Sequence, residues 1–172
     1  SPPATCDEFL RDFPMRWAAA QNLTRSEPQW VPIDWFFLIN EYNGPAAGNS
    51  MEEAILQSLC EVVERHVGSI ISYEQRPTPR IDPTSVRDPA ALELLGKFQR
   101  QGIELHLRDF SLDTGIPTVG VLAYDPRTFP TKSELVFTAG TTSNPEKSLC
   151  RALTEIAQLA GDFESHTSYR PT

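Results

Sequence analysis

The sequence predicts a mixed α/β domain of the α+β class, in which an antiparallel or mixed sheet carries helices on one face. Two long segments with amphipathic helical periodicity, three short segments with strand character, and prolines between them support this fold class. The chain has 172 residues, of which 15 are proline, against about 5% in an average protein. We expect one domain over residues 1–172, with residues 1–29 as a less ordered N-terminal extension.

The composition excludes several function classes. A net charge of −8 argues against a chain that holds nucleic acid by neutralising phosphates. No window contains eighteen uncharged apolar residues, so we expect no membrane-spanning helix and a soluble domain. The three cysteines form no Cys-x-x-Cys pair, which fits neither a disulfide framework nor a zinc site. Their sparse use favours the cytoplasm.

The first third of the chain contains two weaker segments. Residues 6–21 have helical spacing that is interrupted at Pro14. Residues 30–39 are rich in aromatic and β-branched side chains and predict a strand. A turn-rich loop over residues 43–49 then leads into the strongest helix signal of the sequence.

That helix is expected to begin after Ser50. Ser50 and Glu53 have the spacing of a capping box, in which each side chain binds a backbone N–H of the first turn. The amphipathic pattern continues to about Val67, and we expect Gly68 to end the helix.

The middle of the chain predicts a surface connection, a helix and a pair of strands. Four prolines over residues 73–89 indicate the connection, and a helix is expected over about residues 89–101. Residues 103–108 alternate between polar and apolar types, and residues 118–124 are almost all apolar. These two segments predict an antiparallel pair joined by a turn at residues 112–115.

A third strand and a last helix complete the predicted fold. Residues 134–139 have strand character. Asn144 is expected as the N-cap of the last helix, with Pro145 at its first position. This helix should reach about residue 160.

One face of the helix after Ser50 collects polar side chains. They are Glu53, Gln57, Ser58, Glu61, Glu64 and Arg65. Glu61 and Glu64 lie one turn apart, with about 5–6 Å between their Cβ atoms, and can share hard cations such as Mg²⁺. Arg65 can restrain Glu61 or contact a phosphate oxygen. A solvated charged face is the alternative interpretation.

The last helix repeats this arrangement. Its polar face contains Lys147, Ser148, Arg151, Thr154, Glu155 and Gln158. If the two helices lie side by side, three carboxylates and two guanidinium groups would surround one ligand. An acidic protein can hold an anion such as ATP in this way because metal ions supply the positive charge.

A P-loop is excluded in spite of a suggestive segment. Residues 140–148 lie between a predicted strand and a helix and end in Lys-Ser. A P-loop needs a glycine directly before its lysine, where this chain has Glu146, whose carboxylate would repel phosphates. The three histidines are isolated in the sequence, and no catalytic residue is assigned.

Two segments of the sequence resemble the ATP-binding signatures of the YcaO family. The first contains Ser-x-x-Glu-x-x-Glu-Arg as Ser58, Glu61, Glu64 and Arg65, and the second contains Ser148, Glu155 and Gln158. The resemblance covers about residues 30–170 and implies a site, different from a P-loop, that holds ATP through Mg²⁺ ions. It implies the following roles: metal ligands at Glu61, Glu64 and Glu155, and ATP contacts at Ser58, Arg65, Ser148, Arg151 and Gln158.

The resemblance also implies a type of reaction. Family members use ATP to phosphorylate the oxygen of a peptide backbone amide, which gives an azoline in the cyclodehydratases, or a thioamide or related product. Others act as accessory factors in the methylthiolation of a ribosomal protein. The expected partners are a peptide or protein substrate, a sulfur-donor or substrate-recognition protein, and a second copy of the chain in a homodimer.

The length of the chain leaves three interpretations open. Family proteins are usually more than twice as long, so we expect a fragment whose parent is the ATP-dependent enzyme. The alternative is a non-catalytic YcaO-like scaffold or partner-binding domain without a complete nucleotide site. A third interpretation is nucleotide binding without peptide chemistry.

Overall fold

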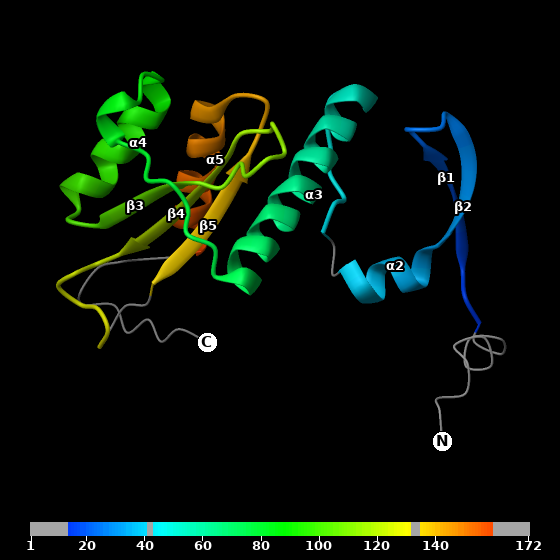
Figure 1. Ribbon diagram of the computed structural model, residues 1–172, viewed down its shortest axis with the longest axis horizontal. Coiled ribbons are helices and arrows are strands. Elements are labelled where there is room, and N and C mark those ends of the chain that lie inside the picture. The colour runs from blue at the N-terminus through cyan, green and yellow to red at the C-terminus, as the bar shows by residue number, and fades with distance from the viewer. Residues whose placement is uncertain (1–13, 41–42, 132–134, 160–172) are drawn as a thin grey trace. The chain divides into compact units, whose positions relative to one another are not determined.

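Figure 1 shows the computed structural model of the chain, in which residues 14–40, 43–131 and 135–159 are described. The chain forms two compact units, one reaching Pro45 and the other beginning at Ala46. None of the described helices is long and apolar enough to cross a membrane.

The first unit contains a hairpin and a short helix. Its elements are β1 (Trp17–Asn22), β2 (Glu27–Pro32) and α2 (Ile33–Asn40). The two strands are antiparallel, with Trp17 opposite Pro32. The prediction of a helix over residues 6–21 is wrong for residues 17–21, which belong to β1, while residues 6–13 lie outside the described part.

The prediction of a strand over residues 30–39 holds for residues 30–32, which belong to β2, and is wrong for residues 33–39, which form α2. Proline has no N–H group to continue a strand ladder. In the first turn of α2, the Asp34 carboxylate accepts hydrogen bonds from the backbone N–H and the Nε of Arg16, both at 2.7 Å. An acidic side chain at this position stabilises a helix N-terminus.

The second unit confirms the mixed α/β prediction. Its elements are α3 (Met51–Glu74), the 3₁₀ turn η1 (Pro83–Ser85), α4 (Pro89–Arg100), β3 (Glu104–Asp109), β4 (Thr118–Tyr124), β5 (Val136–Thr141) and α5 (Pro145–Leu159). The sheet has the order β3-β4-β5, and both pairs are antiparallel. The three strands of this sheet, α4 and the start of α5 lie within two residues of their predicted positions.

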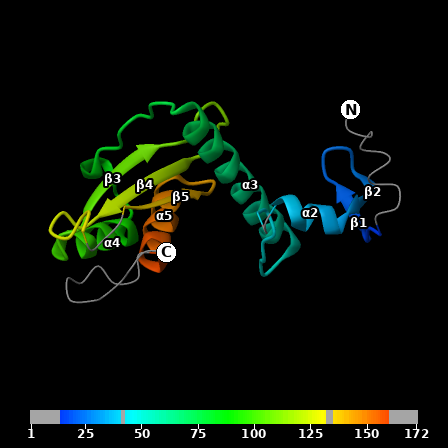
Figure 2. The same cartoon turned by 90° about the horizontal axis from the view of Figure 1, so that it is seen from below.

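The core lies between this sheet and the helices α4 and α5. Figure 2 shows both helices on the same side of the strands. Alternate residues of β4 point to that side, so that Val119, Val121 and Ala123 are buried. The apolar face of α5 packs against them with four fully or almost fully buried side chains: Leu149, Ala152, Leu153 and Ile156.

Helix α3 begins as expected and ends later than expected. The Ser50 side chain accepts a hydrogen bond from the Glu53 N–H at 3.2 Å, while the Glu53 carboxylate accepts one from the Asn49 N–H at 2.7 Å. The prediction that Gly68 ends the helix is wrong. The helix continues to Glu74, and the left-handed residue that terminates it is Gln75, with φ of 51°.

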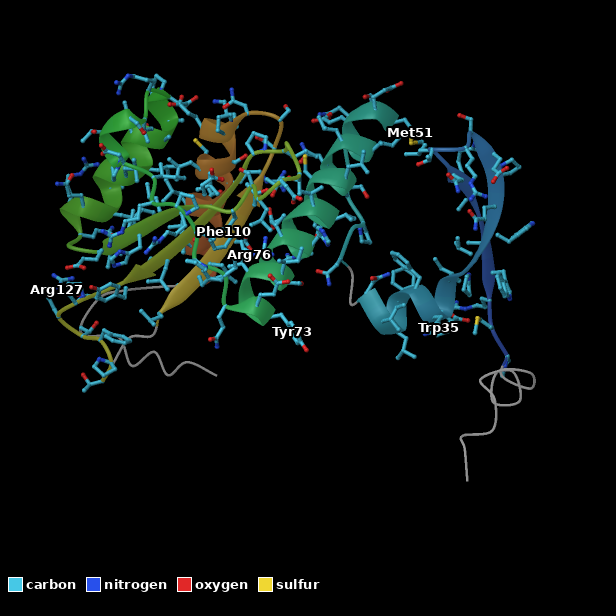
Figure 3. All side chains as sticks on the ribbon, in the orientation of Figure 1. Trp35, Met51, Tyr73, Arg76, Phe110 and Arg127 are labelled. Atoms are coloured by element: carbon cyan, nitrogen blue, oxygen red, sulfur yellow. The ribbon has the colours of Figure 1, made fainter. Side chains whose placement is uncertain are left out.

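The apolar stripe of α3 is exposed among the described residues. Leu59 and Val62 are each 52% exposed, and Met51 and Tyr73 are still more accessible. Figure 3 shows Met51 and Tyr73 at opposite ends of the helix. The buried residues of α3 are Cys60, Glu64 and Val67, so the helix turns the edge of its polar face toward the rest of the unit.

Two glycine substitutions test this description of α3 and of the β5–α5 contact. A Cβ atom at Gly68 would meet nothing within 4 Å, so Gly68→Ala should raise the free energy of unfolding by about 1 kcal/mol through helix propensity. A Cβ atom at Gly140 would lie 2.2 Å from the Ser148 carbonyl oxygen, so Gly140→Ala should lower it by about 2 kcal/mol. Urea denaturation measures both, and a loss of stability in Gly68→Ala would contradict a continuous α3.

Candidate functional site

The candidate site lies where α3 meets the edge of β5 and one side of α5. The Arg151 Nη1 on α5 donates a hydrogen bond to Gln57 Oε1 on α3 at 2.5 Å. The Glu64 carboxyl group on α3 lies close to the backbone N–H of Thr141, the last residue of β5, which lowers its pKa. The polar faces of the two helices are therefore brought together, as the sequence predicts.

Local packing fixes the position of α5 in this arrangement. The Asn144 side chain caps the helix by accepting hydrogen bonds from the N–H groups of Glu146 and Lys147, at 2.9 and 3.1 Å. The absence of a side chain at Gly140 lets β5 approach the backbone of α5 closely. Arg151 consequently projects from α5 toward α3.

Glu64 is the central titratable group of the site. The residue is only 8% exposed. Burial is the largest cause that raises the pKa of its carboxyl group to about 7, and the nearby Glu155 carboxylate adds to it. Arg65, Arg151 and the Thr141 N–H act in the opposite direction but do not compensate. The Glu64 carboxyl is therefore partly protonated at neutral pH.

Cys60 lies one turn before Glu64 on the buried side of α3. Burial raises the pKa of its thiol, while the Arg151 charge opposes this and the Glu64 charge adds to it. The thiol therefore stays protonated at neutral pH, and it is a poor nucleophile in that form.

Glu61 and Arg65 form a loose pair beside this buried group. The Arg65 Nη2 is 3.8 Å from the Glu61 Oε1, and the two side chains are 52% and 24% exposed. An exposed pair at this distance contributes little to stability. Both side chains are consequently accessible to a ligand.

Three of the residues expected as ATP contacts have different surroundings. Ser148 is fully buried, and its hydroxyl donates to the Pro117 carbonyl while accepting from the Thr142 N–H, both at 2.9 Å. Its side chain therefore holds the turn between β5 and α5. Gln158 is exposed in the last turn of α5, and Ser58 is half-buried on α3.

The carboxylates do not form a ready-made metal centre. Within residues 14–40, 43–131 and 135–159, no three His, Cys, Asp or Glu side chains are close enough together to hold a metal ion. Glu61, Glu64 and Glu155 are thus neighbours in the site without being gathered around one point. Like charges on Glu64 and Glu155 oppose a closer approach when no cation lies between them.

Sequence reasoning did not assign two groups that the structure places in the site. Gln57 was on the predicted polar face of α3, and its spacing from Glu61 and Glu64 is the signal that could have included it. The Thr141 N–H carries no sequence signal, because it acts through the backbone at the edge of a sheet.

Comparisons with known proteins give a consistent result. A family model described as YcaO cyclodehydratase, ATP- and Mg²⁺-binding, matches residues 1–172. An uncharacterised protein of Methanothermobacter thermautotrophicus is 34% identical over 156 residues, which cover 84% of this chain and 40% of the relative. The chain thus spans less than half of that relative's length.

Solved structures of similar fold point the same way. A heterocyclase in complex with substrate and cofactor has a TM-score of 0.71 and 28% identity, over 83% of this chain and 20% of the other. The structure of YcaO from Methanopyrus kandleri bound with AMPPCP and Mg²⁺ has a TM-score of 0.66 and 30% identity. The matched region covers 86% of this chain and 41% of that protein.

The raised pKa of Glu64 predicts a pH-dependent stability. Between the ordinary pKa of 4.5 and about 7, the unfolded chain loses this proton while the folded chain keeps it. Stability should therefore fall by about 3 kcal/mol as the pH rises through this range and level off above it. Glu64→Gln should remove the fall and be more stable than the unmodified chain at pH 8.

Urea denaturation at pH 4.5 and pH 8 measures this effect. Glu61→Gln, on the same helix and more exposed, is the matched control and should keep the difference between the two pH values. An equal loss of stability with pH in Glu64→Gln and the unmodified chain would show that Glu64 is not the group responsible.

Proposed function

The chain belongs to the YcaO family, and from this premise we propose that it forms the ATP- and Mg²⁺-binding core of an enzyme that activates a peptide backbone amide by phosphorylation. The observation that carries this proposal is the convergence of α3 and α5 on the buried Glu64 carboxylate. A cluster of carboxylates and guanidinium groups on two facing helices suits a complex of metal ions with a polyphosphate.

The donor set fits Mg²⁺. Carboxylate oxygens are preferred ligands of this ion, which usually keeps water and phosphate oxygens as its remaining ligands. Glu64 is a buried acid whose pKa is raised to about 7, and an adjacent divalent cation would stabilise its ionised form. Glu61 from the same helix and Glu155 from α5 flank it and complete the proposed set of ligands.

We assign the phosphate contacts to two arginines. Arg65 is exposed beside Glu61, and Arg151 lies between α3 and α5. Guanidinium groups bind phosphate oxygens in a bidentate manner. Ser58 and Gln158 are proposed as polar nucleotide contacts, while Ser148 contributes by holding the β5–α5 turn in place.

The proposed chemistry is supported by the family to which the chain belongs. Amide oxygen is a poor leaving group. After a nucleophile has added to the amide carbon and the oxygen has taken the γ-phosphoryl group of ATP, the C–O bond can break, with phosphate as the leaving group and ADP as the other product. Bound Mg²⁺ would neutralise charge on the transferring group. The residues of this chain bind and orient the phosphates, since Arg65 and Arg151 hold them from both helices.

A non-catalytic scaffold is the second candidate function. It is favoured by the absence, among the described side chains, of three carboxylates close enough to hold an ion unaided. In that case the polar faces would hold α3 and α5 together through contacts such as Arg151 with Gln57, and no nucleotide would bind.

Calorimetry with AMPPCP and MgCl₂ tests the proposal. We expect binding that is lost when EDTA removes Mg²⁺, and an affinity at least tenfold lower in Glu64→Gln, which corresponds to about 1.4 kcal/mol. Glu93→Gln is the control, because this exposed carboxylate on α4 pairs with Lys97 at 2.8 Å and lies outside the site. Equal affinities in Glu64→Gln and the unmodified chain would overturn the assignment.

Peptide-dependent phosphate release distinguishes the remaining alternatives. The assay uses the parent protein with ATP, Mg²⁺ and candidate peptides. An enzyme of the proposed type releases phosphate faster when its peptide is present, whereas a nucleotide-binding domain without peptide chemistry does not respond. A scaffold shows neither nucleotide binding nor phosphate release.

A further inference from the structure

Two arginines lie side by side where the segment after α3 pairs with the end of β3. Arg80 and Arg108 are directly opposite each other in an antiparallel bridge. The hydrogen bonds that join the two segments come from the residues that follow the arginines, since Ile81 and Asp109 donate their N–H groups across the pair at 3.1 and 3.0 Å. Opposite side chains approach most closely in a pair of this kind, with about 4.5–5.5 Å between their Cβ atoms.

Both arginines belong to the face of the sheet that is opposite to α4 and α5. Successive side chains of a strand point to opposite faces. Leu107 is buried in the core on the side of the two helices, so Arg108 and its partner Arg80 point to the other face. His106 shares this face, and its ring stacks on that of Tyr124 with 5.9 Å between the centroids and 5° between the planes.

The positive charge of the two arginines is not balanced by a carboxylate. Within the described part of the chain, neither Arg80 nor Arg108 has an ion pair, and the Arg80 guanidinium has no hydrogen bond. Arg108 donates from Nη1 to the Thr78 carbonyl at 3.0 Å, which uses one of its five N–H groups. Like charges that face each other across a strand pair are destabilising. An anion that contacts both guanidinium groups would relieve this repulsion.

A cavity lies beside the two arginines. It has a volume of about 420 Å³ and is lined by residues 80–83 and residues 105–108. This volume is within the range of pockets that bind small molecules. Apart from its charged groups, the lining includes the apolar residues Ile81, Pro83 and Leu105. The cavity can therefore accommodate an anion that carries an organic group.

The one carboxylate in the lining of the cavity has another role. The Asp82 Oδ1 accepts hydrogen bonds from the N–H and the hydroxyl of Thr84, at 2.9 and 2.8 Å. Asp82 is thus the N-cap of η1. The two guanidinium groups outnumber this carboxylate, so the lining keeps an excess of positive charge although the chain as a whole is acidic.

We propose that this cavity binds a small phosphate monoester, with the phosphate group between Arg80 and Arg108. At neutral pH such a group carries almost two negative charges and three acceptor oxygens, and guanidinium groups bind it in a bidentate manner. A carboxylate or a sulfate ester has a single charge and balances two arginines less well. The His106 ring can donate a further hydrogen bond in either protonation state, and the organic group contacts Pro83 and Leu105.

This site goes beyond the proposed function, because it is separate from the proposed nucleotide site. The residues assigned to ATP and Mg²⁺ are on α3 and α5, next to β5. The two arginines lie at β3, which is the opposite edge strand of the three-stranded sheet.

Phenyl phosphate tests the chemistry of the ligand. Its affinity for the full chain is measured by calorimetry at pH 8 and low ionic strength, without nucleotide or Mg²⁺. Phenyl sulfate has the same ring and one charge less, and should bind at least tenfold more weakly. Inorganic phosphate lacks the organic group and should also bind more weakly. Equal affinities for phenyl phosphate and phenyl sulfate would overturn the proposal, and equal affinities for phenyl phosphate and inorganic phosphate would overturn the assignment to an ester.

Removal of one charge tests the position of the site. Arg80→Gln should weaken binding of phenyl phosphate at least tenfold, while Arg100→Gln, at the exposed end of α4, should not alter it. Without ligand, Arg80→Gln should also raise the urea midpoint of unfolding, because it removes the repulsion between the two arginines. The proposal is overturned if phenyl phosphate fails to bind, if Arg80→Gln binds it normally, or if Arg80→Gln lowers the urea midpoint. A failure of ATP binding would leave these results unaffected.

Discussion

The packing of α3 against the edge of the sheet by its polar side, with Glu64 buried, is the constraint that shapes the candidate site. Glu64 lies close to the Thr141 N–H, so the polar edge of α3 faces β5 and α5. A helix that packed by its apolar stripe would turn Glu61 and Glu64 to solvent and separate them from Arg151. Leu59 and Val62 are exposed as a consequence, because a helix cannot bury both its polar and its apolar face against one edge of a sheet.

The two edges of the three-stranded sheet are covered by different parts of the chain. At the β5 edge, the side chain of Glu64 on α3 lies close to the N–H of Thr141. At the β3 edge, residues 79–81 pair for a short distance and Pro83 then stops the pairing. An antiparallel sheet of three strands necessarily has two edges that need cover. One edge thus lies beside charged groups of two helices, while the other is partly covered by the backbone of residues 79–81.

Local signals made much of the fold predictable from the sequence, and tertiary contacts account for most of the errors. Asn144 followed by Pro145 marks the start of α5, and the apolar run of β4 marks its position at residues 118–124. In the first turn of α2, Asp34 accepts hydrogen bonds from the distant Arg16, a contact that periodicity does not reveal. Helical spacing placed Glu61, Glu64 and Glu155 on facing surfaces, but the burial of Glu64 depends on the position of β5, which only the folded chain defines.

The same burial links the protonation of Glu64 to the proposed binding of a cation. With its pKa raised to about 7, Glu64 is partly neutral near physiological pH, and a neutral Glu64 does not repel Glu155. The proton therefore reduces the electrostatic cost of holding α3 against α5 before a ligand binds. When a cation binds to Glu64, it must displace this proton, as metal ions do at other acidic ligands. The proton thus neutralises the charge of Glu64 in the free chain, as we propose that Mg²⁺ does in the complex with nucleotide.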